Sequence, residues 1–233
     1  MREHWSRTHG LRRLLWVSDK EPIRPLKDVW LRPRRVFREL ATHPIGATDY
    51  ILAATQGMAT AVMVFRTPLP GAGVTASQVL GSALIFGALS GVVSMFLFAA
   101  IYGRIGRRIA GQSARNQVIH VLAYGGIPVA ASLILWIFTA LLVGEAAIVD
   151  RPGVEVDGFV AFVLRVQFTA YILLALWTIV LQVMGFSETL GLTVRRAFAV
   201  WVLGQVLGAL LTYLFLTILI GILLPGVVPP TPH

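Results

Sequence analysis

Five long runs of hydrophobic residues, separated by short polar segments, dominate this chain. The runs cover about 48–65, 79–103, 117–144, 159–184 and 197–224. Each holds the roughly 20 residues that an α-helix needs to cross the hydrocarbon core of a bilayer. The pattern therefore predicts an all-α, polytopic membrane protein, built as a bundle of five transmembrane helices.

A shorter amphipathic segment precedes the first run. Pro33 suits the first turn of a helix, and Val36, Phe37 and Leu40 then fall on one face, opposite a face rich in arginine. Such a helix lies in the membrane interface, with Trp30 at headgroup depth. We expect it to anchor the first span; the alternative is a docking surface for a cytoplasmic partner.

Composition leaves little room for anything but these elements. The chain has 233 residues, of which 56% are hydrophobic and 13% are charged. We expect a basic cytoplasmic arm over 1–46, a five-helix transmembrane domain over 47–225 and a short outer tail over 226–233. A separate catalytic domain has no place in this division.

The basic residues predict the orientation. Eleven Lys and Arg precede the first run, and six more lie in the turns after the second and fourth runs, whereas the opposite side has two. Cytoplasmic segments retain Lys and Arg, so the N-terminus is expected inside and the C-terminus in the periplasm. Eighteen Arg against two Lys indicate a GC-rich bacterial genome, so the membrane is expected to be a bacterial inner membrane. Cations at span ends meet anionic lipid headgroups, which argues against nucleic-acid binding.

Polar residues inside the runs form a candidate site near mid-membrane. Pro128 cannot donate to the carbonyl of Tyr124, so the third span is expected to kink there. The carbonyls freed by a kink need donors within the membrane, and glutamines of the first and fifth runs lie at similar depth. We assign an inner polar cluster to these residues: Asp49, Gln56, Tyr124, Pro128 and Gln205. Tight helix packing and a polar substrate path are both compatible with it.

Small residues recur at four-residue spacing in two of the runs. Gly87 and Gly91 match the small-xxx-small pattern, and so do Gly204 and Gly208. The pattern lets helix backbones approach closely. It predicts helix contacts without saying which helix is the neighbour.

Arg165 is the one basic residue inside a run. An ionisable residue at that position is a candidate functional group, although its side chain can reach the outer headgroups or pair with a carboxylate of the preceding loop. That loop has four carboxylates, whose spacing matches no calcium-binding loop: Glu145, Asp150, Glu155 and Asp157.

Signatures of enzymes and cofactor sites are missing from the sequence. It contains no cysteine, no HExxH and no glycine-rich phosphate loop, so we expect no metal, no cofactor and no enzymatic activity. His120 stands at the inner end of the third run, where we interpret it as an interfacial residue.

Three short motifs carry a family resemblance. The arm reads Trp-Leu-x-Pro-Arg-x-Val-Phe from Trp30 to Phe37, the second inner turn contains Gly-Gln-Ser at 111–113, and the third run opens with the Tyr124 to Pro128 break. With five spans and this order, residues 28–224 resemble the Yip1 domain family in its bacterial form. Eukaryotic members have a longer arm with acidic and aromatic motifs, so this short basic arm gives no prediction of their small-GTPase binding.

The resemblance implies a non-enzymatic membrane protein that associates with itself or with other membrane proteins. We therefore expect a scaffold, assembly factor or accessory subunit. The alternative is a small transporter, channel or lipid-handling protein that uses the polar site near the kinked third helix. The expected cytoplasmic loop contacts are Gly111, Gln112, Ser113 and Asn116.

Overall fold

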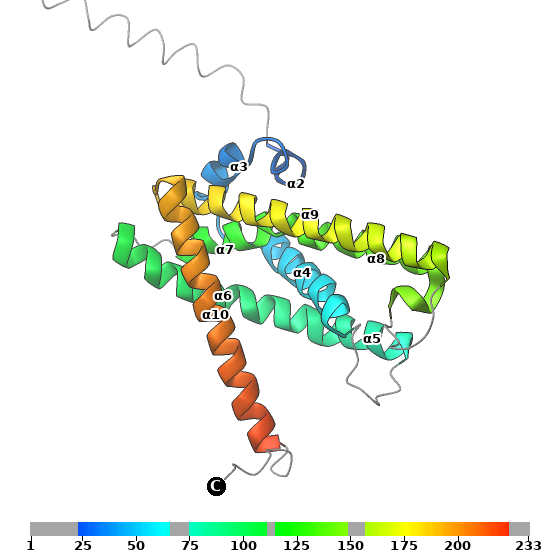
Figure 1. Ribbon diagram of the computed structural model, residues 1–233. Helices are drawn as coiled ribbons and strands as arrows, with labels where there is room; N and C mark the ends of the chain where they lie inside the picture. The colour runs from blue at the N-terminus through cyan, green and yellow to red at the C-terminus, as the bar shows by residue number, and fades with distance from the viewer. Residues whose placement is uncertain (1–22, 66–74, 111–114, 149–156, 224–233) are drawn as a thin grey trace, which may run out of the picture.

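The computed structural model describes residues 23–65, 75–110, 115–148 and 157–223, with the side chains of the last helix described to Leu211. All regular elements in these ranges are helical (Figure 1). The helices are α2 (Pro25–Asp28), α3 (Pro33–Leu40), α4 (Ala47–Phe65), α5 (Ala76–Ser82), the π-helix η1 (Ala83–Gly87), α6 (Ala88–Ala110), α7 (Arg115–Gly125), α8 (Ile127–Val143), the 3-10 helix η2 (Gly144–Ala147), α9 (Gly158–Thr189) and α10 (Val194–Leu223).

Four helical segments of the described chain are long and apolar enough to cross a membrane. They are Ala76–Ile109, Asn116–Ala147, Gly158–Thr189 and Val194–Leu211. The first predicted run forms α4, which is not among them. Asp49, Thr55 and Gln56 lower the hydropathy of this 19-residue helix. The protein is therefore an all-helical chain with four candidate spans, and a fifth span remains a prediction.

The third run is broken where the sequence predicts a kink. α7 ends at Gly125, and α8 begins at Ile127 with Pro128 in its first turn. Proline suits that position because its missing N–H needs no partner in a first turn. The two halves therefore meet at Gly126, which has no side chain to obstruct a neighbour.

Glycines bring α4 against the second run. A side chain at Gly57 or Gly91 would overlap with backbone atoms of the facing helix, and the Cβ of a side chain at Gly87 would lie 2.9 Å from the Cα of Met58. The small-residue pattern of the second run therefore makes a contact within the same chain, in which η1 and α6 pack closely against α4.

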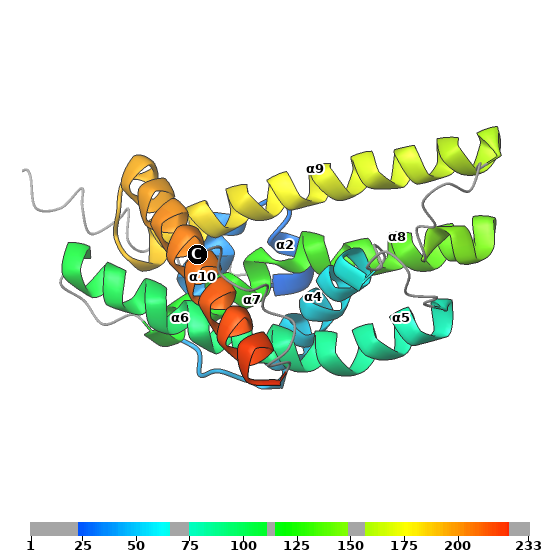
Figure 2. The ribbon, with the colours of Figure 1, turned by 60° about the horizontal axis from the view of Figure 1, so that its bottom comes forward.

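The last helix crosses the bundle instead of running along it. Figures 1 and 2 both show α10 passing over α6 at a steep angle. Gly204 lies against the ring of Tyr102, and Gly208 lies against that of Phe98. The Tyr102 hydroxyl donates to the carbonyl of Trp201 at 3.1 Å. The second predicted glycine pattern is thus also occupied by this chain's own helices.

The arm packs on the protein at one end of the bundle, which we call the arm end. Val36, Phe37 and Leu40 of α3 are buried, whereas the sequence interpretation placed this face in the membrane interface. Glu188 of α9 accepts a hydrogen bond from Arg38 at 2.9 Å and lies 3.7 Å from Arg34. The apolar face of the arm therefore meets protein, and its interfacial location remains a prediction.

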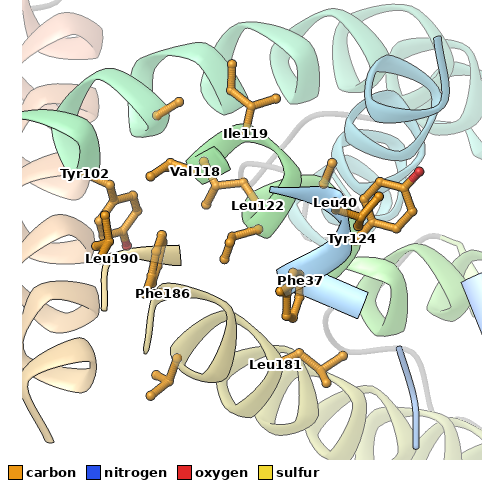
Figure 3. Close-up of a cluster of buried hydrophobic side chains, with 14 of the residues drawn as sticks. Phe37, Leu40, Tyr102, Val118, Ile119, Leu122, Tyr124, Leu181, Phe186 and Leu190 are labelled. Atoms are coloured by element: carbon orange, nitrogen blue, oxygen red, sulfur yellow. The ribbon is translucent and has the colours of Figure 1, made fainter. Parts of the chain in front are cut away.

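The main hydrophobic core lies at the arm end. Figure 3 shows Phe37 of α3, Tyr102 of α6, Leu181 and Phe186 of α9 and residues of α7 gathered there. The rings of Tyr102 and Phe186 have centroids 4.6 Å apart. We call this cluster the arm-end core, and it fixes the ends of α6, α7, α9 and α10 relative to one another.

Candidate functional site

A buried polar link joins the arm, α4 and α7. The Nδ1 atom of His120 lies 2.8 Å from Oδ1 of Asp49, and its Nε2 atom donates to the carbonyl of His43 at 3.0 Å. The second oxygen of Asp49 accepts from the backbone N–H of Gly46 at 2.9 Å. Asp49 and His120 are each 2% exposed. The two side chains of the link are thus internal and hydrogen-bonded, and their backbone partners, His43 and Gly46, lie in the exposed segment before α4.

The link changes the interpretation of two residues. His120, interpreted from sequence as an interfacial residue, is instead the partner of Asp49. Asp49 lies in the first turn of α4, away from the glutamines with which the sequence grouped it. A buried carboxylate requires a partner. His120 is the only histidine within a hydrophobic run, so the sequence contained a signal for this pair.

Gln56 closes the break in the third run. Its Nε2 atom donates to the carbonyl of Ala123 at 2.7 Å, and its amide lies directly over Gly126. Tyr124 and Pro128 are buried beside it. The structure therefore brings Gln56 to the break, as the sequence proposed, with the carbonyl of Ala123 as the acceptor.

A cavity of about 810 Å³ lies between α4, α6, α9 and α10. Gln56 and Gln205 both line it, whereas Asp49, Tyr124 and Pro128 are not among its lining residues. Thr60, Val64 and Ser90 line the cavity and are also exposed, so it opens on the outside of the bundle. We call this cavity the lateral groove. Its volume falls within the roughly 300–1,000 Å³ of typical ligand sites.

The groove is apolar with a few uncharged polar groups. Among its described lining residues none is Asp, Glu, Lys, Arg or His. Ser90 and Ser94 donate to the carbonyls of Gly87 and Gly91 at 3.0 Å. Trp201 donates its indole N–H to Oε1 of Gln182 at 2.8 Å. The lining therefore offers neutral hydrogen-bonding groups and no group suited to acid–base chemistry near neutral pH.

One face of α9 supplies much of this lining. Tyr171, Ala175, Thr178 and Gln182 all line the groove and follow one another at helical spacing. Thr178 is 9% exposed, and its hydroxyl has no hydrogen-bond partner in the described chain. The sequence interpretation missed this stripe, although Tyr171, Thr178 and Gln182 have the same seven- and four-residue spacing as Asp49, Gln56 and Thr60 in the first run.

Several predicted residues lie elsewhere. Gly111, Gln112 and Ser113 are outside the described residues, and Asn116 is exposed in the first turn of α7. Arg165 is exposed on α9. Of the acidic residues proposed to pair with it, Asp150 and Glu155 also fall outside the described ranges. Of the described residues among them, neither Asn116 nor Arg165 lines the lateral groove.

The fold and the groove define a class: a polytopic helical membrane protein with a cavity that opens laterally between its helices. The Yip1 domain model matches residues 27–217, which is most of the chain and agrees with the resemblance found over 28–224. The chain therefore belongs to the Yip1 domain family. No curated protein and no solved structure matches it significantly.

Proposed function

We propose that this Yip1 domain protein is a non-enzymatic, lipid-handling membrane protein, which binds an amphiphile of the bilayer in the lateral groove. The observation that carries this proposal is the groove itself, an apolar cavity with a few neutral polar groups that opens on the outside of the bundle. Ligand sites in proteins have this composition. A cavity that opens within a membrane is exposed to lipid before any other ligand.

The packing of the helices favours this function over a scaffold that works through small-residue faces. Gly87, Gly91, Gly204 and Gly208 already contact other helices of the same chain. They are therefore covered, and a partner protein has no access to them. Among transport, conduction and lipid handling, the uncharged lining favours the last, because ion pathways place charged groups or exposed carbonyls in the pore.

The orientation belongs to the same proposal. With the five spans predicted from the sequence, seventeen Lys and Arg lie on the side of the N-terminus, against two on the other. In a bacterial inner membrane this places the arm in the cytoplasm and the C-terminus in the periplasm. The arm end of the groove then faces the inner leaflet, whose anionic headgroups suit the basic arm.

Filling the groove tests the proposal. Ala175→Phe places a ring in the cavity, and Ala161→Phe, on an exposed position of the same helix, is the matched control. Each protein is purified in mild detergent, and the lipid that stays bound is measured by native mass spectrometry. We expect lipid adducts on the wild type and on Ala161→Phe, and their loss on Ala175→Phe. Equal adducts on all three proteins would contradict the proposal.

A scaffold function retains one supporting observation. The C-terminal half of α10 extends beyond the other helices in Figure 1, and Leu210 is 65% exposed. This half offers a surface on which a second membrane protein or a second copy can pack. A photocrosslinker at position 210 should then give a defined adduct in native membranes, with Leu173 on α9, 62% exposed, as the control position. Only lipid adducts at both positions would count against a scaffold.

A further inference from the structure

The lateral groove restricts the charge of its ligand. Its described lining has hydroxyl, amide and indole groups but no cationic or anionic side chain. A phosphate or ammonium group placed inside would lose its hydration without gaining a counter-ion, which is costly within a bilayer. The lining therefore favours uncharged ligands over charged ones.

At least three polar groups in the groove have hydrogen-bonding capacity available for a ligand. Within the described chain the amide of Gln205 and the hydroxyls of Tyr171 and Thr178 make no hydrogen bond, although all three residues line the cavity. Gln182 uses its Oε1 for Trp201, and Gln56 uses its Nε2 for Ala123. The amide and the phenol hydroxyl can each donate and accept, so together they suit a ligand with hydroxyl or carbonyl oxygens.

The amides of the groove gather in one part of it. Gln56, Gln182 and Gln205 lie toward the arm ends of their helices, whereas Val64 and Phe65 line the groove at the other end of α4, and Tyr171 lies toward the other end of α9. Gln56 and Phe65 are nine residues apart, which corresponds to about 13 Å along a helix. The groove therefore has its amides in one part and large apolar side chains in another, which suits an amphiphile with a small head.

We propose that the lateral groove binds an uncharged lipid whose head carries hydroxyl or carbonyl oxygens, with the head at Gln205 and the acyl chain toward Phe65. This inference rests on the proposed lipid-handling function and narrows it to neutral lipids. Diacylglycerol has the required chemistry. Phosphatidic acid, which differs from it by one phosphate, provides the matched charged probe.

The test uses the full-length protein in nanodiscs with two photoreactive probes at sub-saturating concentration. Diacylglycerol and phosphatidic acid carry the same diazirine on the same acyl chain, and labelled peptides are quantified by mass spectrometry. We expect diacylglycerol to label groove-lining peptides of α4 and α9 at least about tenfold more than phosphatidic acid. The reason is that burying the charge of the phosphate lowers the binding constant by more than about tenfold. Ala175→Phe should abolish this labelling, and Ala161→Phe should retain it.

A pair of glutamine variants tests the position of the head. Gln205→Leu should lower diacylglycerol labelling about fivefold, the factor that one net hydrogen bond contributes. Gln167→Leu changes a buried glutamine of α9 outside the groove and should leave labelling unchanged.

The outcomes separate the two proposals. Equal labelling of the groove by both probes, or preferential labelling by phosphatidic acid, would overturn the neutral-lipid inference and leave lipid handling in place. Labelling that never falls in the groove with either probe would overturn lipid handling and this inference together.

Discussion

The arm end and the lateral groove differ in whether their polar side chains have hydrogen-bond partners within the protein. At the arm end, the buried side chains of Asp49 and His120 hydrogen-bond to each other and to the backbone of Gly46 and His43. In the groove, Gln205 and Tyr171 have no partner in the described chain. The two regions are built from the same helices. One holds the fold together, and the other leaves hydrogen-bonding capacity available.

The two regions should contribute differently to stability. Buried polar groups that are fully paired stabilise a unique arrangement, whereas unpaired ones raise the free energy of the folded state. A ligand or lipid that hydrogen-bonds to the amide of Gln205 would remove this cost in the groove. Substitutions in the two regions should consequently have unequal effects on unfolding.

The largest expected effect is the loss of the buried contact between Asp49 and His120. His120→Leu leaves the carboxylate of Asp49 without its side-chain partner at 2% exposure. We expect a loss of about 3–5 kcal/mol in the free energy of unfolding, measured by thermal unfolding in detergent. Adding Asp49→Leu should recover most of it, because replacing a whole buried pair by apolar residues is often neutral. A His120→Leu protein that melts like the wild type would contradict the role of the link.

The next effect concerns the contact that holds one wall of the groove to α4. Gly87→Ala places a methyl group 2.9 Å from the Cα of Met58, and such overpacking costs about 1–3 kcal/mol. Gly81→Ala is the matched control, since no atom lies within 4 Å of its added Cβ. The control should melt at or slightly above the wild-type temperature, because alanine is the better helix former. The same loss in both variants would remove the packing explanation.

A comparison of two glutamines sharpens the contrast between the regions. Gln56→Leu removes the donor to the Ala123 carbonyl and should cost about 1 kcal/mol. Gln205→Leu removes an amide that has no hydrogen bond in the described chain and should change stability by less than about 0.5 kcal/mol. Both are measured by denaturant unfolding in mixed micelles. A larger loss for Gln205→Leu would show that the groove amide is structural.

The smallest expected effect lies at the surface of the arm. Glu188→Gln removes two ion pairs whose arginines are 55% and 73% exposed, and exposed pairs contribute about 0.2–1 kcal/mol. Hydrogen exchange in α3 should rise modestly, and high salt should reduce the difference from the wild type. Glu39→Gln, which removes the pair within α3, is the control. Equal exchange in the two variants would mean that Glu188 does not help to hold the arm.

The helices and the break were predictable from local features of the sequence. The first and fifth hydrophobic runs predict helices whose ends lie within a few residues of those observed for α4 and α10, and the third run covers α7 and α8 together. Pro33 and Pro128 each fix a helix start because proline fits a first turn and lacks a donor. These features depend on neighbouring residues alone, so a single sequence contains them.

Contacts between helices were harder to predict from the sequence. Asp49 and His120 are 71 residues apart, and nothing in the local pattern of either says that they meet. The glycines predict close contacts, yet a Gly-xxx-Gly face fits many neighbours, and that Gly204 faces Tyr102 depends on the steep crossing of α10. The lateral groove also arises from how helices diverge, which hydropathy does not encode.

The distance along the chain between Asp49 and His120 has a consequence for biosynthesis. During synthesis Asp49 leaves the ribosome 71 residues before the histidine that pairs with its carboxylate, and α4 is not among the helices long and apolar enough to cross a membrane. A lone carboxylate is unfavourable in lipid. We therefore expect α4, if it enters the bilayer as predicted, to depend on α7 for a stable position there, and chains truncated before position 120 should leave α4 at the translocon or in water.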